Sequence, residues 1–200
     1  MNDTAIAGRK KAIRAAVLPA RAAFAAEQGE AASAALATLA LTLPELAIPA
    51  AVVGGYWPIR GEADPRPLLA ELQARGAVLG LPVVTGAGLL FRRWDRGVPL
   101  VSAGLGTLGP PAEAPLMTPS ILFVPLAAFD RRCHRLGYGK GFYDHAIAQL
   151  TAAVPQPRLV TIGLAYAMQE VPHIPVEAHD RCLDAIVTER GVIRAPDGPA

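Results

Sequence analysis

Residues 51–84 read AVVGGYWPIRGEADPRPLLAELQARGAVLGLPVV, and this segment carries the strongest signal for the fold. It begins with a short apolar strand, AVVGGYW, and ends with a second one, AVLGLPVV. Between them, Asp64 and Pro65 suit the N-cap and first position of an amphipathic helix that continues to Arg75 and stops at Gly76. A strand, a helix and a strand in this order predict a βαβ unit with parallel strands and a right-handed crossover.

The segments on either side extend this unit into a layered domain. An Ala-rich helix is expected from about Thr4 to Leu41, and Pro19 should kink it or split it in two. Further strands are expected at residues 89–94, 98–101, 121–129, 158–166 and 183–189, with an exposed loop at 102–119 and a helix at 143–150. We therefore predict one α/β domain over residues 1–200, with three layers, a largely parallel central sheet and an N-terminal helical segment.

Composition excludes several classes of protein. The chain has 52% hydrophobic residues, enough for a sizeable core, and a net charge of +2, too small for the broad positive field that nucleic-acid binding needs. Two cysteines are too few for the disulfide framework of a small secreted domain. The N-terminal residues mix charges with apolar side chains, which suits neither a signal peptide nor a membrane span. We expect a cytoplasmic protein that binds neither nucleic acid nor membranes.

The segment RLGYGKGFYD (135–144) lies between a predicted buried strand and a predicted helix. Glycines alternate with larger residues at Gly137, Gly139 and Gly141. Such a turn lets backbone N–H groups approach phosphate oxygens, and the following helix directs its positive end toward them. Lys140 inside the turn and Arg135 at its edge add cations suited to phosphate. A tight turn that merely needs positive φ is the alternative, but this combination favours an anion site.

Two other groups of charged residues could join this site. Lys10 and Arg14 are four residues apart on the first predicted helix and share a face, with Lys11 beside them; a solvated basic face is the simpler interpretation of these residues alone. Asp144 and Asp180 could meet at one end of the sheet, where their carboxylates would suit Mg²⁺. Taken singly, each is more typical of a helix start or a turn.

Other chemistry is poorly supported. Cys133 is adjacent to His134, and His179 is three residues before Cys182, but neither spacing is typical of a structural zinc site. No GxSxG motif of a serine hydrolase is present.

Taken together, the motifs resemble the 5-formyltetrahydrofolate cyclo-ligases, also called 5,10-methenyltetrahydrofolate synthetases. The resemblance runs along nearly the whole chain in family order: KKAIR (10–14), YWPIRGE (56–62), LP (81–82), VP (124–125), AFD (128–130), RLGYGKGFYD (135–144), AYAMQ (165–169) and HD (179–180). It departs from the family pattern at Phe142, usually tyrosine, at Cys133, usually glycine, and in the run 108–113. The resemblance implies an ATP- and Mg²⁺-dependent ligase of one-carbon metabolism that converts 5-formyltetrahydrofolate to 5,10-methenyltetrahydrofolate and releases ADP and phosphate.

The same resemblance implies roles for individual residues. ATP would be held by Lys10, Lys11, Ala12, Ile13 and Arg14 and by Arg135, Leu136, Gly137, Tyr138, Gly139, Lys140, Gly141, Phe142 and Tyr143. The folate would be contacted by Arg14, Trp57, Glu62, Tyr138, Gly139, Lys140, Gly141 and Phe142. Mg²⁺ would be held by Asp144 and Asp180, and the catalytic cations would be Lys140, Arg135 and Arg14.

Two alternatives remain at this stage. A sugar-phosphate isomerase or CoA-transferase-like enzyme would share the strands and the phosphate turn but need no ATP. A non-catalytic nucleotide- or folate-binding module would bind without releasing phosphate. The expected partners are small molecules, and the sequence does not reveal the oligomeric state.

Overall fold

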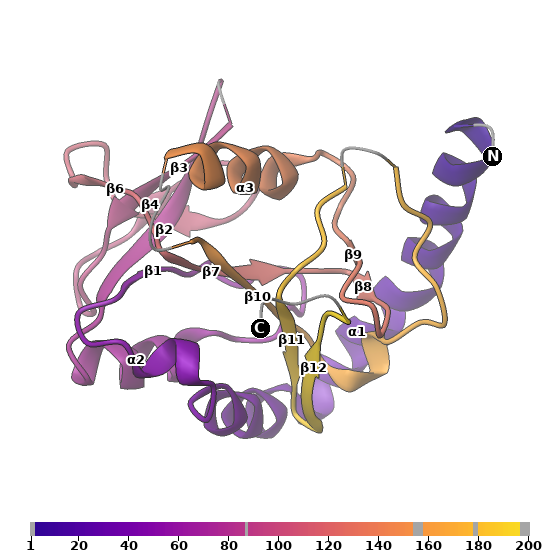
Figure 1. Cartoon of the computed structure of the whole chain (residues 1–200), viewed down its shortest axis with the longest axis horizontal. Coiled ribbons are helices and arrows are strands. Elements are labelled where there is room, and N and C mark those ends of the chain that lie inside the picture. Colours follow the sequence, from indigo (N-terminus) through magenta and orange to yellow (C-terminus); the bar gives the residue numbers. More distant parts are fainter. Residues whose placement is uncertain (1–2, 87, 154–157, 178–179, 197–200) are drawn as a thin grey trace.

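The fold, seen in a computed structural model that describes residues 3–86, 88–153, 158–177 and 180–196, is built around one eight-stranded sheet (Figure 1). The strand order is β12-β11-β10-β7-β1-β2-β3-β6. These strands are β1 (Val52–Gly54), β2 (Val78–Thr85), β3 (Gly88–Arg93), β6 (Leu116–Met117), β7 (Ile121–Pro125), β10 (Val160–Leu164), β11 (Ala185–Thr188) and β12 (Gly191–Arg194). Two small ladders lie outside the sheet and consist of β4 (Val101–Ser102) with β5 (Leu108–Gly109) and β8 (Ala128–Phe129) with β9 (Arg135–Leu136).

The centre of the sheet is parallel and its edges are antiparallel. Strands β11, β10, β7, β1 and β2 pair in parallel, whereas β12 at one edge and β3 and β6 at the other pair antiparallel. The predicted βαβ unit is present as β1, α2 (Arg66–Ala74) and β2, with Val53 opposite Leu79. The prediction of an α/β fold with a largely parallel sheet and an N-terminal helix is confirmed.

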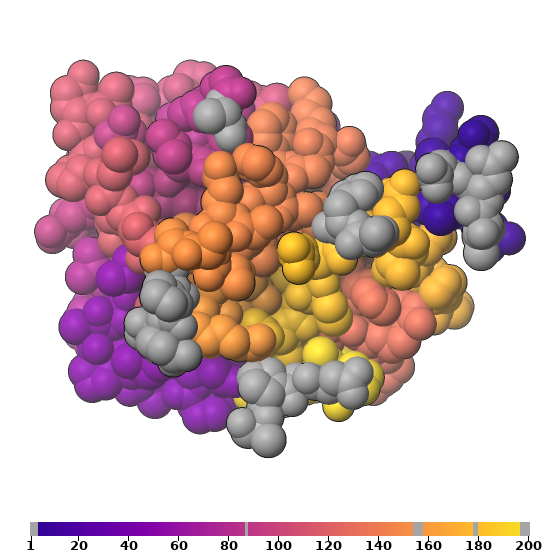
Figure 2. Space-filling view, turned by 45° about the horizontal axis from the view of Figure 1, so that its top comes forward, coloured from indigo at the N-terminus to yellow at the C-terminus, as the bar shows by residue number. Residues whose placement is uncertain are grey.

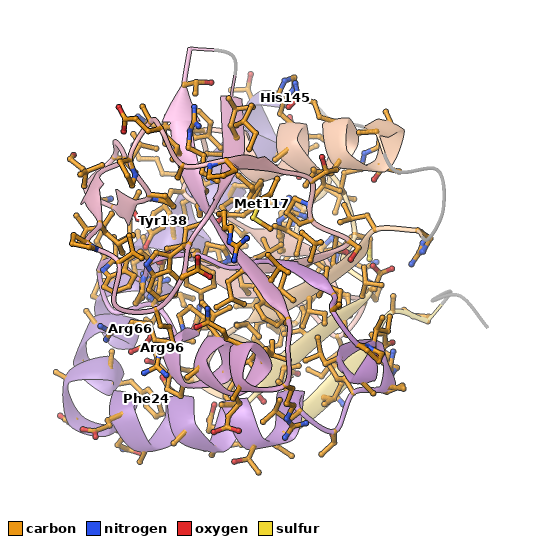
Figure 3. The ribbon with its side chains drawn as sticks, turned by 90° about the vertical axis from the view of Figure 1, so that its left-hand side faces the viewer. Phe24, Arg66, Arg96, Met117, Tyr138 and His145 are labelled. Atoms are coloured by element: carbon orange, nitrogen blue, oxygen red, sulfur yellow. The ribbon has the colours of Figure 1, made fainter. Side chains whose placement is uncertain are left out.

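Helices cover both faces of the sheet. Along β7, Ile121 and Phe123 pack with α1 (Asp3–Ala40) and α2, whereas Leu122 and Val124 pack with α3 (Phe142–Ala153) on the other side. Because a central parallel strand is buried on both faces, its apolar run is continuous rather than alternating. Figure 3 shows Phe24 of α1 and His145 of α3 at opposite ends of this stack of three layers. In Figure 2, α3 lies across the middle of the face turned toward the viewer.

The first helix, for which Pro19 predicted a kink or a split, is not split. It continues without a break for 38 residues from Asp3 to Ala40. The ring of Pro19 removes one backbone hydrogen bond, and packing of the helix against the sheet outweighs that loss. Figure 1 shows the helix changing direction as it passes from its projecting N-terminal turns to the lower face of the sheet. Within the part of the chain that the structure describes, no helix has both the length and the apolar character of a bilayer span.

Several predicted boundaries also shift. Helix α2 begins at Arg66, and Pro65 rather than Asp64 holds the N-cap position, while Asp64 accepts the Arg66 N–H at 2.9 Å. The apolar run 121–129 forms two strands, β7 and β8, because Pro125 has no N–H to continue the ladder. Of the strand expected at 98–101, only the last residue is in β4, and the expected loop at 102–119 contains β5 and β6. The edge strand β12 has no counterpart in the prediction. The short helices are η1 (Pro44–Ala47) and η2 (Ala167–Gln169).

Candidate active site

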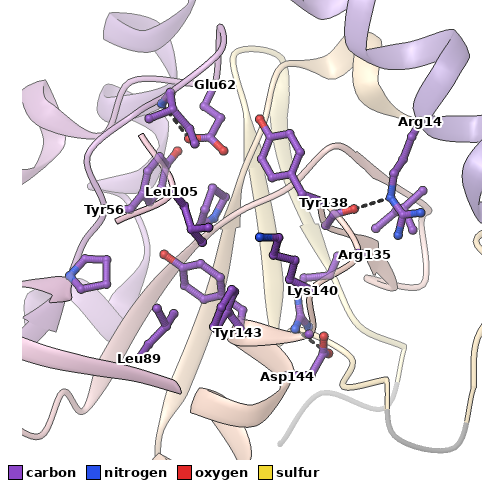
Figure 4. A pocket seen from close by; sticks show the side chains of 18 of the residues that line it. Arg14, Tyr56, Glu62, Leu89, Leu105, Arg135, Tyr138, Lys140, Tyr143 and Asp144 are labelled. Carbon is purple, nitrogen blue, oxygen red and sulfur yellow. Dashed lines mark hydrogen bonds and ion pairs between the residues drawn. The ribbon is translucent and has the colours of Figure 1, made fainter. Parts of the chain in front are cut away.

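A cavity of about 360 Å³ opens at the carboxyl ends of β1, β2 and β7 (Figure 4). It is lined by Tyr56 and Trp57, which follow β1, by Pro82 and Val84 of β2, and by Pro125 at the end of β7. In an open parallel sheet, the strand ends leave a crevice that connecting segments surround, which is where ligands of such folds bind. The glycine turn at residues 137–141 forms the opposite wall.

The glycine turn packs directly against α1. Gly139 and Gly141 have φ values of +93° and +66°, which side chains disfavour. A Cβ atom at Gly139 would lie 3.2 Å from the guanidinium of Arg14, and Arg14 Nε donates to the Gly137 carbonyl at 2.7 Å. Helix α3 begins directly after the turn at Phe142, so its positive end faces the cavity. Gly139 and Gly141 therefore supply the positive φ of a tight turn, which both the anion cradle and the purely structural turn require.

Two of the predicted cations differ in how firmly they are held. Arg135 is 8% exposed and donates to Asp144 Oδ1 at 2.6 Å and to the Arg181 carbonyl at 2.5 Å. Burial lowers the pKa of Arg135, and the Asp144 carboxylate opposes that shift. Lys140 is exposed and has no hydrogen-bond or ion-pair partner among the described residues. Figure 4 shows its chain directed into the middle of the cavity, between Tyr138 and Tyr143. Arg135 is thus fixed by its partners, whereas Lys140 is not fixed by any among the described residues.

Lys10 occupies a different position from the one expected of a free phosphate ligand. Its Nζ atom lies 2.6 Å from Asp180 Oδ2 and 2.6 Å from Glu177 Oε2, and the residue is only 8% exposed. Burial by itself lowers the pKa of Lys10, but the hydrogen bonds that its amine donates to the two carboxylates raise it above its usual value. Lys10 therefore stays charged and is already neutralised by carboxylates.

The two predicted metal ligands both line the cavity. Asp144 is paired with Arg135 and Asp180 with Lys10, so each carboxylate has a cation beside it. Among the residues that the structure describes, no group of three His, Cys, Asp or Glu side chains is arranged to hold a metal ion. His179 lies outside the described residues.

The wall farthest from the cations combines aromatic residues with one buried acid. Glu62 is 7% exposed and accepts the Ile59 N–H at 2.9 Å, while the Tyr56 hydroxyl donates to the Ala63 carbonyl at 2.5 Å. Burial raises the pKa of Glu62, against hydrogen bonds and nearby arginines that lower it. Trp57 lies edge-on to Trp94, with ring centroids 6.0 Å apart. A flat ring with N–H donors would find both an apolar slot and a carboxylate here.

Most of the predicted ligand-binding residues reach the cavity, and three do not. The cavity is lined by Lys10, Arg14, Trp57, Glu62, Asp144, Asp180 and every residue from Arg135 to Tyr143. Lys11 and Ala12 are instead exposed on α1, and Ile13 packs against the apolar cluster of Val17, Ala128, Leu136 and Ile174. On a helix, neighbouring residues point in different directions, so the segment 10–14 presents only its first and last residues to the cavity.

Sequence reasoning missed several lining residues. Glu177 had no signal beyond its position three residues before Asp180, and Leu105 and Thr107 lie in the Gly- and Pro-rich run that sequence patterns describe poorly. Leu89 and Val84 face each other across the β2–β3 pair only because that pair is antiparallel and closes over the cavity.

Comparisons with known proteins agree along the chain. A family model described as the 5-formyltetrahydrofolate cyclo-ligase family matches residues 6–189. A relative named 5-formyltetrahydrofolate cyclo-ligase in Escherichia coli K12 is 33% identical over 159 residues, covering 76% of this chain and 85% of that protein. A relative of the same name in Mycolicibacterium smegmatis is 32% identical over 161 residues, covering 76% and 80%.

Solved structures show the same fold. The NMR structure of a 5,10-methenyltetrahydrofolate synthetase from Aquifex aeolicus is 30% identical, with a TM-score of 0.78 over 96% of this chain and 95% of that one. A 5,10-methenyltetrahydrofolate synthetase from Mycoplasma pneumoniae, at 21% identity and a TM-score of 0.69 over 90% and 98%, supports the fold alone.

Proposed function

The chain belongs to the 5-formyltetrahydrofolate cyclo-ligase family, and on that premise we propose that it uses ATP to close 5-formyltetrahydrofolate to 5,10-methenyltetrahydrofolate, releasing ADP and phosphate. Family membership makes it a ligase and confirms the resemblance read from the motifs. The observation that carries the proposal is that one cavity joins a cationic glycine turn to a slot with aromatic walls and a buried carboxylate. The glycine turn suits a polyphosphate, and the slot with aromatic walls suits a pterin ring.

The chemistry begins with an unreactive amide. The formyl oxygen on the pterin nitrogen is a poor leaving group, so it first attacks the γ-phosphorus of ATP, the bond from that phosphorus to the bridging oxygen breaks, and ADP leaves. The bridge nitrogen of the folate then attacks the formyl carbon and loses its proton. The carbon–oxygen bond breaks, inorganic phosphate leaves, and the amidinium ring is closed. Each step needs the two substrates held in line within one cavity.

The cations of the cavity would act on the phosphoryl transfer. Arg135, fixed by Asp144, and Arg14, fixed by the Gly137 carbonyl, are preorganised to receive phosphate oxygens. Lys140 has no partner among the described residues and lies at the junction of the two ends, so it suits the γ-phosphoryl group whose position changes during the reaction.

Mg²⁺ is part of the same proposal. Magnesium bound with a nucleotide takes one or two carboxylates and fills its other positions with phosphate and water oxygens, so two lining acids are sufficient. Asp144 and Asp180 fit this requirement, since both border the cavity beside the glycine turn. When bound, the ion would neutralise part of the charge on the phosphates.

The folate end would be formed by Glu62, Trp57 and Tyr138. Glu62, as a buried carboxylate, would accept hydrogen bonds from the pterin N–H groups and orient the ring. Trp57 is braced by Trp94 on one side and by Arg66, whose guanidinium lies 5.1 Å from its ring centroid. A braced aromatic wall keeps the ring in place while the formyl group reacts.

The test follows the formyl oxygen. A substrate that carries heavy oxygen in its formyl group is mixed with protein, ATP and Mg²⁺, and the released phosphate is examined by mass spectrometry while product is followed by its near-UV absorbance. Label in the phosphate, in step with product, is expected. Unlabelled phosphate appearing with product would overturn the phosphorylation step. Product without nucleotide would favour the isomerase-like alternative, and substrate binding without product would favour a binding module.

A further inference from the structure

Arg21 connects three separate segments to the middle of α1. The residue has no exposed surface and does not line the cavity. Its Nη1 donates to the Leu126 carbonyl at 3.0 Å, and its Nη2 donates to the Arg60 carbonyl at 2.8 Å and to the Tyr138 hydroxyl at 2.5 Å. One guanidinium therefore fixes the end of β7, the turn before Glu62 and the glycine turn relative to one another.

The geometry of these contacts requires a guanidinium. Its donors point in fixed directions from one plane, whereas a lysine amine offers three donors from a single point. The Arg21 Nε atom is buried without a hydrogen-bond partner among the described residues. A buried N–H without an acceptor is unfavourable, so the orientation of this side chain is set by the three acceptors at its other end.

The turn that precedes Glu62 lies directly on α1 beside Arg21. Gly61 has a φ of +72°, and a Cβ atom there would lie 3.2 Å from Ala22 Cα and 3.2 Å from Ala25 Cβ. This close approach places the Arg60 carbonyl at the Arg21 side chain. Glu62 follows two residues later, so its position depends on how this turn sits on the helix.

Tyr138 lies between Arg21 and Glu62. Figure 4 shows its hydroxyl directed toward the Glu62 carboxylate, and hydrogen bonding between the two side chains counteracts the rise in the Glu62 pKa. Arg21 and Arg60 act in the same direction through their charges, and the Tyr138 ring lies 5.6 Å and 5.5 Å from their guanidinium carbons. Tyr56 beyond the end of β1 and Tyr143 of α3 also interact with this carboxylate; burial raises the pKa of both phenols, and the charge of Glu62 raises it further.

We propose that Arg21 is a positioning residue that holds Glu62 and Tyr138 in the arrangement that receives the folate ring. It touches neither substrate and acts through the Arg60 carbonyl and the Tyr138 hydroxyl. The inference rests on the proposed function, because it concerns the folate end of the same cavity. The glycine turn is also held by Arg14, whose Nε donates to the Gly137 carbonyl at 2.7 Å, so the ATP contacts there are expected to change less than the folate contacts.

The experiment compares Arg21→Gln, which removes the charge, with Arg21→Lys, which keeps it. Both variants should raise KM for 5-formyltetrahydrofolate by about tenfold, the loss expected for a charge-assisted contact, with a smaller rise in KM for ATP and a change below about twofold in kcat. Arg92→Lys is the matched control, since Arg92 also donates to a backbone carbonyl, that of Ala114, and does not line the cavity. It should leave both KM values unchanged.

The pH profile separates positioning from simple stabilisation. The midpoint below which folate binding weakens should move to higher pH in Arg21→Gln, and less in Arg21→Lys, because the lost charge no longer favours ionised Glu62. The proposal is overturned if folded Arg21→Gln keeps the wild-type KM for the folate and the wild-type pH midpoint of folate binding. It is also overturned if KM rises equally for the folate and for ATP while the pH midpoint stays unchanged.

If neither Arg21 variant folds, Tyr138→Phe takes their place, because Tyr138 is only half-buried. A raised KM for the folate and a pH midpoint at higher pH support the proposed connection from Arg21 through Tyr138 to Glu62. Wild-type values of both quantities overturn it. If the wild-type protein neither binds nor converts the folate, both the proposed function and this inference are wrong. If the wild-type protein turns over normally and the variants behave like it, only this inference is wrong.

Discussion

The amine of Lys10 lies 2.6 Å from the Oδ2 atom of Asp180, although the two residues are 170 positions apart in the sequence. One was expected to hold phosphate and the other to hold magnesium, and without nucleotide they neutralise each other, with Glu177 as a second acid on Lys10. If these residues hold a magnesium nucleotide as proposed, its binding would exchange this ion pair for contacts with the ligand.

The first prediction concerns that exchange. Glu177→Gln removes one of the two acids that compete with phosphate for Lys10, so ATP affinity should rise by up to about fivefold, the upper range for a partly exposed ion pair. Lys10→Met should lower ATP affinity. Calorimetric titration with ATP measures both, and Glu30→Gln, an exposed change elsewhere on α1, is the control. Weaker binding by folded Glu177→Gln would show that this acid assists the nucleotide rather than competing with it.

A second prediction tests the glycine turn. Gly139→Val places a branched side chain at a φ of +93° and within 3.2 Å of the Arg14 guanidinium, so it should disturb the cradle without removing core packing. ATP affinity should fall by about a hundredfold, a loss that corresponds to about 3 kcal/mol, while the circular dichroism spectrum stays unchanged. Wild-type affinity in a folded variant would exclude the turn as the phosphate site.

The acids beside the turn carry the third prediction. Asp144→Asn and Asp180→Asn each keep an oxygen and lose the charge that attracts a cation, so half-saturation by Mg²⁺ should rise about tenfold in each variant. Initial rates measured against Mg²⁺ at saturating ATP give this value. If both variants show the wild-type dependence of the initial rate on Mg²⁺, these acids serve only to fix Arg135 and Lys10.

The fourth prediction is a pH dependence that follows from burial of Glu62. Because burial raises the pKa of Glu62, its carboxylate is protonated, and folate binding weakens, at a higher pH than an ordinary glutamate would give. The folded state then binds this proton more readily than the unfolded state. The cost of burying the charge is present above the raised pKa and disappears as the pH falls through it. Glu62→Gln should flatten the pH profile of KM for the folate and raise Tm at neutral pH. If the pH profile of KM for the folate is equally steep in Glu62→Gln, a group other than Glu62 is responsible for it.

The last prediction assigns the mobile cation. Lys140→Met should lower kcat by about two to three orders of magnitude, because the amine would stabilise charge that develops during phosphoryl transfer. Lys140→Arg keeps the charge and should retain most of that rate. Single-turnover measurements of phosphate release and ring closure should slow together in the methionine variant. Slowing of ring closure alone would place Lys140 in the second step.

Elements that depend only on neighbouring residues were predictable from the amino-acid sequence. The strands at each end of residues 51–84, the helix between them and the glycine turn before α3 all follow from local patterns, because apolar periodicity and positive φ are properties of short segments. The same local patterns left open whether Pro19 kinks or splits α1, which stays continuous, and they missed the division of the buried run into two strands at Pro125.

Contacts between residues far apart in the chain could be seen only in the folded structure. Arg14 reaches the Gly137 carbonyl across 123 positions, and Arg21 joins Tyr138 to the turn before Glu62, although the sequence gives no sign that α1 passes beside that turn. The antiparallel return of β3, which brings Leu89 to the cavity, was equally undetermined. Contacts of this kind depend on how whole layers stack, and that is fixed by the core as a unit rather than by any one segment.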